Sequence, residues 1–198
     1  MKRILLWSTV LLLGVALGSV GFWGVTTQWQ GDAEGGAIQP ELVADYIHAV
    51  IQANRTVYSR NIVDKMHESG VVEAAEHWKE EAALPLPAQF MMDTGKLVAE
   101  RGKGIKYRLV SLFPIYVWNS PETDFERRGL EEVSKNPAKP FTGFVRIGHQ
   151  KYFQAIYADV AVSPGCASCH NAHMNSPRRD WKVNDVMGGI VITIPVPS

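Results

Sequence analysis

A chain of 198 residues is long enough for one domain with its own core and one additional segment. Its 20 basic residues balance its 20 acidic ones, which argues against a nucleic-acid partner because such a partner requires a basic surface. The only two cysteines lie in one short motif, so no further thiol remains for a structural disulfide. We find no Ser/His/Asp set, paired-carboxylate motif or phosphate-binding glycine loop, and therefore expect no enzymatic activity.

An apolar run from Ile4 to Val25 follows two basic residues at the N-terminus. It is about long enough to cross a bilayer as one transmembrane helix. Trp7 and Trp23 lie near its ends, where interfacial aromatic residues are common. Because the basic residues come first, we expect a single-pass protein of the inner (cytoplasmic) membrane with its C-terminal domain in the periplasm. The alternative is a signal peptide cleaved near Ala16-Leu17-Gly18, which we disfavour because the apolar run continues past that point.

Gly14 and Gly18 lie four residues apart in this run and would share one helix face. This spacing predicts a helix–helix contact in the membrane, such as a homodimer, although glycine is also generally frequent in membrane helices. The predicted organisation is a membrane anchor over residues 1–30, a glycine-rich linker over 31–39 and a folded domain over 40–198.

The first part of the folded domain has helical patterns. A long amphipathic helix is expected from Pro40 to about Gly70, because apolar residues recur at spacings of mostly three and four. A further helical piece is expected over residues 71–80. The segment Leu84-Pro85-Leu86-Pro87 cannot continue it, since proline disfavours helix in the residue before. Another helix is expected over residues 88–101.

The second part has mainly strand patterns. Alternating or β-prone apolar segments predict strands over residues 105–109, 113–118, 141–147, 152–162 and 188–196. Thr123-x-x-Glu126 is a capping box that predicts a helix running to about Ser134. Helices followed by a mainly antiparallel sheet define an α+β domain.

The segment Cys166-Ala167-Ser168-Cys169-His170 is the most specific motif of the chain. Two cysteines three positions apart and an adjoining histidine are typical of covalent haem attachment. The two thiols would form thioethers with the two vinyl groups of the porphyrin, and the His170 imidazole would ligate the iron. One such motif predicts one haem c and a one-electron centre.

The motif has three other interpretations. A thioredoxin-like dithiol should open a helix after a strand, whereas Pro164-Gly165 comes before this motif and Asn171 follows it. A zinc site requires four ligands, and only His173 is close in sequence. The third interpretation is a structural disulfide between the two cysteines.

Several segments resemble the extracytoplasmic c-type haem domains of bacterial chemoreceptors, sensor kinases and cyclases, a family long catalogued as a domain of unknown function. The matching segments are 57–60, 84–90, 124–127, 136–137 and, most specifically, 166–188. The resemblance implies a PAS-like fold with a five- or six-stranded antiparallel sheet, N-terminal helices packed against it and one haem c. It also implies that His170 is the axial ligand.

This chain differs from that family in two respects. Some members use a cysteine as the distal iron ligand, and no cysteine is free for this role here. Many members continue into a cytoplasmic signalling domain, whereas this sequence ends at Ser198, and we therefore expect no fused output module.

The distal ligand would then be another residue, unless the sixth iron position is open, which would favour binding of a small gas. By analogy with relatives that carry histidine before the proline-rich segment, His77 is the first candidate, and Met66, His67, Met91 and Met92 are the alternatives. Each of these side chains could instead serve only packing or the surface. Arg178, Arg179 and Lys182 are candidate partners of the haem propionates, because charge-assisted pairs with carboxylates are strong; a solvated loop is the other interpretation.

Together these features predict a membrane-anchored, periplasmic monohaem cytochrome c. It would transfer one electron at a time with a redox protein or a membrane electron-transport complex. The alternative function is a redox or gas sensor that signals through a separate membrane partner, which the family resemblance favours. A haem enzyme is disfavoured because the sequence offers no clear distal acid–base groups.

Overall fold

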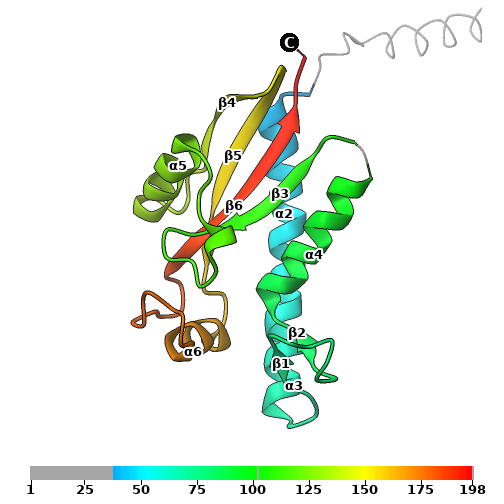
Figure 1. The fold of residues 1–198 in the computed structure, drawn as a ribbon, viewed down its shortest axis with the longest axis vertical. Helices are drawn as coiled ribbons and strands as arrows, with labels where there is room; N and C mark the ends of the chain where they lie inside the picture. Colours follow the sequence, from blue (N-terminus) through cyan, green and yellow to red (C-terminus); the bar gives the residue numbers. More distant parts are fainter. Residues whose placement is uncertain (1–37, 102, 198) are drawn as a thin grey trace, which may run out of the picture. The chain divides into compact units, whose positions relative to one another are not determined.

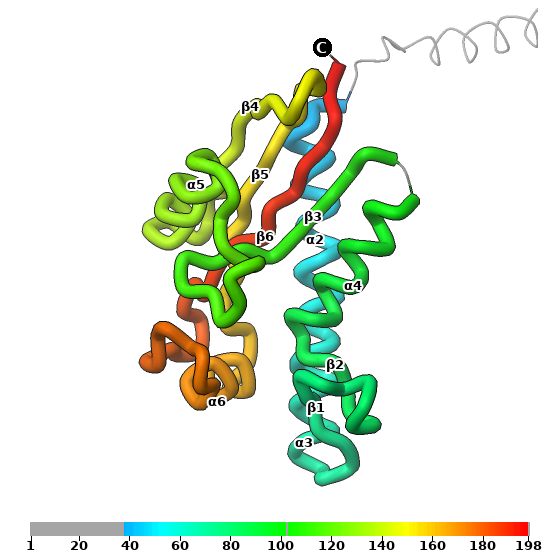
Figure 2. The backbone as a smooth tube through the Cα atoms, viewed as in Figure 1, coloured from blue at the N-terminus to red at the C-terminus, as the bar shows by residue number. Residues whose placement is uncertain are grey.

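The computed structural model describes residues 38–101 and 103–197 (Figures 1 and 2). The predicted anchor, its alternative cleavage site and the glycines Gly14 and Gly18 lie outside the described residues. Within the described ranges, no helix is both long enough and apolar enough to cross a bilayer.

The long N-terminal helix is confirmed. It consists of α2 (Pro40–Val57), a π-helical segment η2 (Tyr58–Val63) and α3 (Asp64–Glu68), which follow one another without a break. Pro40 occupies the first turn, where its missing N–H costs nothing. Gly70 follows the end of α3 with a φ of 66°, a backbone conformation that glycine adopts readily.

The expected helix over residues 71–80 is wrong. A two-residue strand β1 (Ala74–Ala75) pairs in parallel with β2 (Leu84–Pro85), and turns lie between them. The Glu73 carbonyl accepts a hydrogen bond from the Leu84 N–H at 2.9 Å, so this backbone is satisfied by a distant segment rather than by a helix. The next helix, α4 (Pro87–Glu100), is confirmed.

The main sheet is antiparallel, which confirms the predicted α+β class. Its strand order is β3-β6-β5-β4, and the four strands are β3 (Lys106–Val110), β4 (Phe141–Ile147), β5 (Gln150–Val160) and β6 (Val186–Pro195). The sheet of the described chain thus has four strands, where the family resemblance implied five or six.

The expected strand over residues 113–118 is also wrong. This segment forms bends and a short 3₁₀ helix, η3 (Val117–Asn119). The Ser111 N–H donates to the Asn119 carbonyl at 2.8 Å, which closes residues 111–119 into a loop. Pro114 lacks an N–H for a strand ladder, and Tyr116 and Trp118 stack on each other with ring centroids 4.5 Å apart.

Helices cover both faces of the sheet (Figure 1). On one face, α2 and α4 pack against Phe153, Ala155 and Tyr157 of β5. On the other face, α5 (Asp124–Lys135) packs against Ile156, in agreement with the alternation of side chains along a strand. The sheet therefore forms the middle of three layers.

The capping prediction for α5 is partly correct. The Thr123 hydroxyl accepts the Glu126 N–H at 3.2 Å, as in a capping box. The Glu126 carboxylate, however, accepts the N–H of Glu122 at 2.7 Å instead of that of Thr123, and it pairs with Arg108 at 2.6 Å.

Candidate functional site

The Cys-x-x-Cys-His motif lies on a short helix, α6 (Pro164–Ala172), which connects β5 to the loop before β6 (Figure 1). Pro164 occupies its first turn, and Cys166, Cys169 and His170 follow within two turns. The motif therefore does begin a helix after a strand, so the sequence argument against a thioredoxin-like dithiol on that ground was wrong. The choice between a thioredoxin-like dithiol and a haem-attachment site must therefore rest on the chemistry of the thiols.

The motif helix is packed and tied to its own loop. Ala167 and Cys166 contact a small apolar cluster with Ala161, Trp181 and Met187. The Asn171 amide donates to the Trp181 carbonyl and accepts the Trp181 N–H, both at 2.9 Å. These contacts fix α6 against the start of β6.

The long N-terminal helix contacts the connection between β5 and α6. Arg55 donates to the Val160 carbonyl at 2.9 Å, and Arg60 donates to the Val162 carbonyl at 2.7 Å. One turn later, Asp64 accepts the Ser163 hydroxyl at 3.3 Å. In a regular α-helix, residues five apart do not share a face, whereas the wider turn of η2 lets Arg55 reach the end of β5 and Arg60 reach the connection that follows it.

The two thiols differ in their surroundings. Cys166 is half-buried, with its Sγ 3.5 Å from the Ser163 hydroxyl, while Cys169 is more exposed. Burial by neighbouring atoms is the main cause that raises the pKa of the Cys169 thiol, and the negative charges of Cys166 and Glu76 raise it further. A thioredoxin-like dithiol requires a stabilised thiolate, so this environment does not favour that chemistry.

His170 is half-buried on the same helix. Burial lowers the pKa of its imidazole, and the positive charges of His173 and Arg55 lower that pKa further. The neutral imidazole, which is the form that ligates iron, is therefore favoured at neutral pH. Two free thiols one helical turn apart and a neutral histidine form a donor set that fits a covalently attached haem.

His173 ends the motif helix and joins it to another segment. Its Nδ1 accepts the Asn175 N–H at 3.1 Å, which leaves Nε2 to donate toward the Glu76 carboxylate at 3.4 Å. The Tyr116 ring meets the His173 ring edge-on, with centroids 6.0 Å apart. The turn after β1 and the loop after β3 therefore both reach the C-terminal end of α6.

The five distal-ligand candidates lie in different environments. His77 is exposed in the turn after β1, next to Glu76. On α3, Met66 is half-buried, and His67 is exposed and lies 3.8 Å from Glu73. On α4, Met92 is half-buried, whereas Met91 is 2 % exposed and packs in the core between α2 and the sheet.

The candidate propionate partners lie in the loop after α6, where two of the three side chains have partners. The Arg178 guanidinium lies over the Trp181 ring at 3.9 Å and pairs with Asp180 and Asp185. Arg179 is exposed and donates to the Met174 carbonyl at 2.9 Å. Lys182 is exposed. Their predicted role toward a haem stays a prediction.

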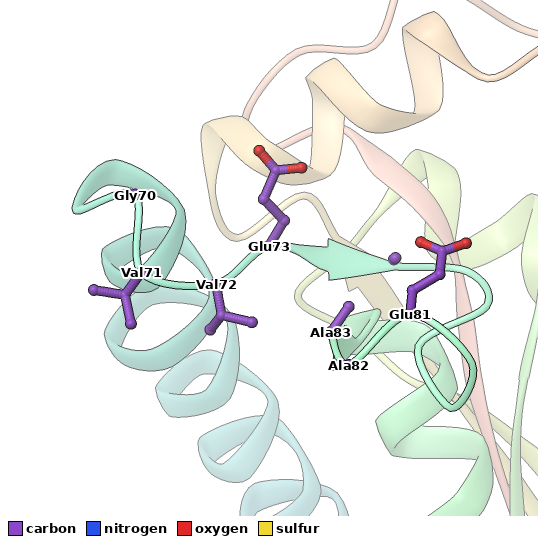
Figure 3. Close-up of a pocket in the computed structure, with 8 residues that line it drawn as sticks. Gly70, Val71, Val72, Glu73, Glu81, Ala82 and Ala83 are labelled. Carbon is purple, nitrogen blue, oxygen red and sulfur yellow. The ribbon is translucent and has the colours of Figure 1, made fainter.

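Other kinds of site have less support. Among residues 38–101 and 103–197, no cluster of three or more His, Cys, Asp or Glu side chains is arranged to hold a metal ion. A cavity of about 400 Å³ lies between the turn after α3 and the turn before β2 (Figure 3). Its lining includes Val71, Val72 and Ala83 but no residue of the motif.

Sequence reasoning did not identify the residues that position the motif helix. Arg55 and Asp64 had no recognisable signal, because each is one charged residue in a helical pattern. Arg60 lies in a segment that carries the family resemblance, which was the one available signal. The role of Glu76 in positioning the motif helix was missed because its segment was expected to be helical.

The fold and the site define an α+β domain that carries a Cys-x-x-Cys-His helix between the last two strands of its sheet. The family model for Tll0287-like proteins matches residues 39–195, and the chain therefore belongs to the Tll0287-like family. The crystal structure of the cyanobacterial haem protein Tll0287 is similar over 81 % of this chain and 98 % of that one, with a TM-score of 0.50 and 17 % sequence identity. At this identity, the likeness shows a shared fold. No curated protein matches the chain.

Proposed function

We propose that this protein carries one haem c, bound through thioethers to Cys166 and Cys169 with His170 as an axial iron ligand. The observation that carries the proposal is the position of all three residues on α6, with a half-buried imidazole whose lowered pKa keeps it neutral. Membership of the Tll0287-like family and the likeness to a haem protein support it. The haem would supply an iron that accepts and releases one electron.

The residues of this chain would hold the group in distinct ways. Cys166 and Cys169 would provide the covalent attachment, and α6 would orient the His170 imidazole toward the iron. Arg55, Arg60 and Asp64 would fix the start of α6 through their bonds to the end of β5 and to the connection between β5 and α6. Glu76 and His173 would hold its other end.

We further propose a membrane-anchored carrier with a PAS-like fold that exchanges single electrons in the periplasm with a redox protein or membrane complex. Support comes from the N-terminal apolar run and from the single attachment motif. Because no described residue adds a second cysteine pair, one electron per molecule is the expected stoichiometry.

The direct test is covalent haem retention. The full chain, produced with a haem-attachment system, should keep its pigment in acidified acetone and on a denaturing gel. The C166S/C169S double variant should lose it, while S168A, a change at an exposed position of the same helix, should retain it. A colourless parent protein, or a double variant that keeps covalent pigment, would refute the proposal.

A redox or gas sensor is the second candidate function. It is favoured by the long helix from α2 to α3, which contacts the start of the motif helix and also begins directly after the N-terminal segment. Spectra of the reduced protein with carbon monoxide and nitric oxide separate the candidates. A haem that binds neither gas would count against gas sensing.

A further inference from the structure

The outward face of α2 carries a stripe of exposed apolar side chains. The helix forms part of the outer layer over one face of the sheet, and its inward face packs in the core (Figure 1). On the outward face, large apolar residues remain in contact with solvent. They are Leu42, Tyr46, Val50 and Val57, which are 42 %, 60 %, 62 % and 51 % exposed. Within the described part of the chain, this stripe is therefore left uncovered.

The spacing along the stripe indicates that another helix covers it. Tyr46, Val50, Ala53 and Val57 are all exposed and follow one another at intervals of four, three and four residues. Single exposed apolar residues are common and need no explanation. An alternation of four and three, however, is the a/d pattern by which two helices pack side by side. At 3.6 residues per turn, these four positions fall within one narrow arc of the helix.

The residues that flank the stripe favour an identical helix as the partner. Positions e and g of a coiled coil select a different partner through complementary charges. Here these positions are Ala49, Asn54 and Thr56, and none of them carries a charge. Two copies of α2 can therefore approach each other without repulsion between like charges. A surface that matches itself in this way suits a two-fold symmetric dimer.

A lipid surface is a poorer match for the same stripe. Helices that lie on a membrane have a wide apolar face bordered by lysine and arginine, which contact the lipid headgroups. Arg55 is the only lysine or arginine of α2, and it is buried against the sheet, where it donates to the Val160 carbonyl. No basic residue of the helix therefore borders the stripe.

We propose that the outward face of α2 is a dimer interface, on which the same stripe of a second copy packs as a parallel pair of helices. The interface itself does not require the haem. Its parallel orientation rests on the proposed membrane anchor, because both chains would then leave the bilayer from the same side. The helix holds only about two heptads of the pattern, and anchoring would offset this short length by raising the effective concentration of the second copy.

The first test is the mass of the full-length protein in a mild detergent, measured by light scattering with the detergent contribution subtracted. The parent should have twice the polypeptide mass of one chain. V50E/V57E should halve this mass, because four carboxylates would meet in the seam. The matched control is I147E on β4, since Ile147 is an apolar residue of similar exposure, 57 %, on another element. I147E should remain dimeric, and a monomeric parent or an equal loss in I147E would overturn the proposal.

The second test is cross-linking in membranes with a short bis-maleimide. It uses C166S/C169S as the background, so that an introduced cysteine is the only thiol of the chain. V57C should form a covalent dimer, because a parallel seam places position 57 opposite itself, whereas an antiparallel one places it opposite position 42. E41C, at an exposed position outside the stripe on the same helix, should form no such product.

The outcomes also separate the other possible partners. A V57C product that contains a different protein, no product in V57C, or as much product in E41C as in V57C would each overturn the proposal. If V50E/V57E does not fold, as judged by circular dichroism, the cross-linking pattern decides, because V57C changes one exposed side chain only slightly. A parent without covalent haem would refute the proposed function but not the interface, since neither test uses the haem.

Discussion

Asn171 is the residue that ties the motif helix to the following loop. Its amide makes two hydrogen bonds of 2.9 Å with the backbone of Trp181, whose side chain is 4 % exposed. N171A leaves both backbone groups without this partner, and it should lower the free energy of unfolding by about 1–3 kcal/mol. Denaturant unfolding followed by tryptophan fluorescence measures the change. S168A, at an exposed position of the same helix, should cost less than about 0.5 kcal/mol.

Equal stability of N171A and S168A would contradict this assignment. It would mean that the loop of residues 173–185 is held by other contacts, such as the pairing of Ala161 with Asn184 and Asp185.

His77 is the distal ligand that we predict for the iron. It adjoins Glu76, which contacts His173 at the end of the motif helix, whereas Met91 is enclosed in the core between α2 and the sheet. H77A should convert a six-coordinate, low-spin haem into a five-coordinate, high-spin one, because the sixth position loses its nitrogen donor. Absorption and electron paramagnetic resonance spectra report this change.

The control for His77 is H149A, which changes an exposed histidine in the turn between β4 and β5 that is not a ligand candidate. Its spectrum should match that of the parent. A low-spin spectrum in H77A would exclude His77, and the same spectra of Met66, His67, Met91 and Met92 variants would then identify the ligand.

The residues proposed to hold the haem are apparent from the sequence because their chemistry is local. Cys166, Cys169 and His170 follow one another within five positions, so spacing alone suggests a role that stays a prediction. Arg55 and Asp159 could not be predicted, since they are 104 positions apart and meet only when α2 packs on β5. A sequence pattern shows the periodicity of a helix but not which charged residue on it will find a buried partner.

Among the elements, the π-helical segment η2 has the clearest structural consequence. Its extra residue lets Arg55, Arg60 and Asp64 all face the connection between β5 and α6. Deleting Asn61, an exposed residue of this segment, should restore a regular α-helix and rotate Asp64 away from Ser163 relative to Arg55. We expect the free energy of unfolding to fall by about 1–3 kcal/mol and the yield of covalent haem to decrease.

N61A, which keeps the chain length, is the matched control and should behave like the parent. Thermal unfolding and the ratio of haem to protein absorbance measure both effects. A deletion variant with the stability and haem content of N61A would show that the wider turn is not required.

The elements that sequence patterns missed share one cause. Residues 71–80 include alanine and glutamate, which favour helix locally, but the Glu73 carbonyl pairs with Leu84 beyond a series of turns. Residues 113–118 are aromatic and β-prone, but Tyr116 and Trp118 stack on each other within the loop, and Tyr116 meets His173 edge-on. In both cases, a tertiary partner overrides the local preference, whereas the long strand pair β5–β6 agrees with it.

At the scale of the whole molecule, the class of the fold followed from the order of the patterns, but the strand order did not. The sequence places two helical segments before the strands, and the sheet inserts β6, the last strand, between β3 and β5. No local sequence pattern specifies that β6 lies between β3 and β5. It follows from burial, because Ile190 and Ile192 of β6 face α2 while Val191 faces α5, so that β6 needs cover on both faces.

The membrane anchor is the last prediction, and it concerns the chain as a whole. We expect Ile4 to Val25 to remain in the mature protein and to hold it in the membrane through a carbonate wash. L11R/L12R should abolish membrane retention, because each arginine at the centre of a membrane helix costs about 2.5–3.5 kcal/mol. L11I/L12I should leave the protein in the membrane. The arginine variant should also lack covalent haem, since thioether formation is expected outside the cytoplasm. Intact-mass measurement is the deciding observation, because a mature N-terminus close to Gly18 would show that the segment is a cleaved signal peptide.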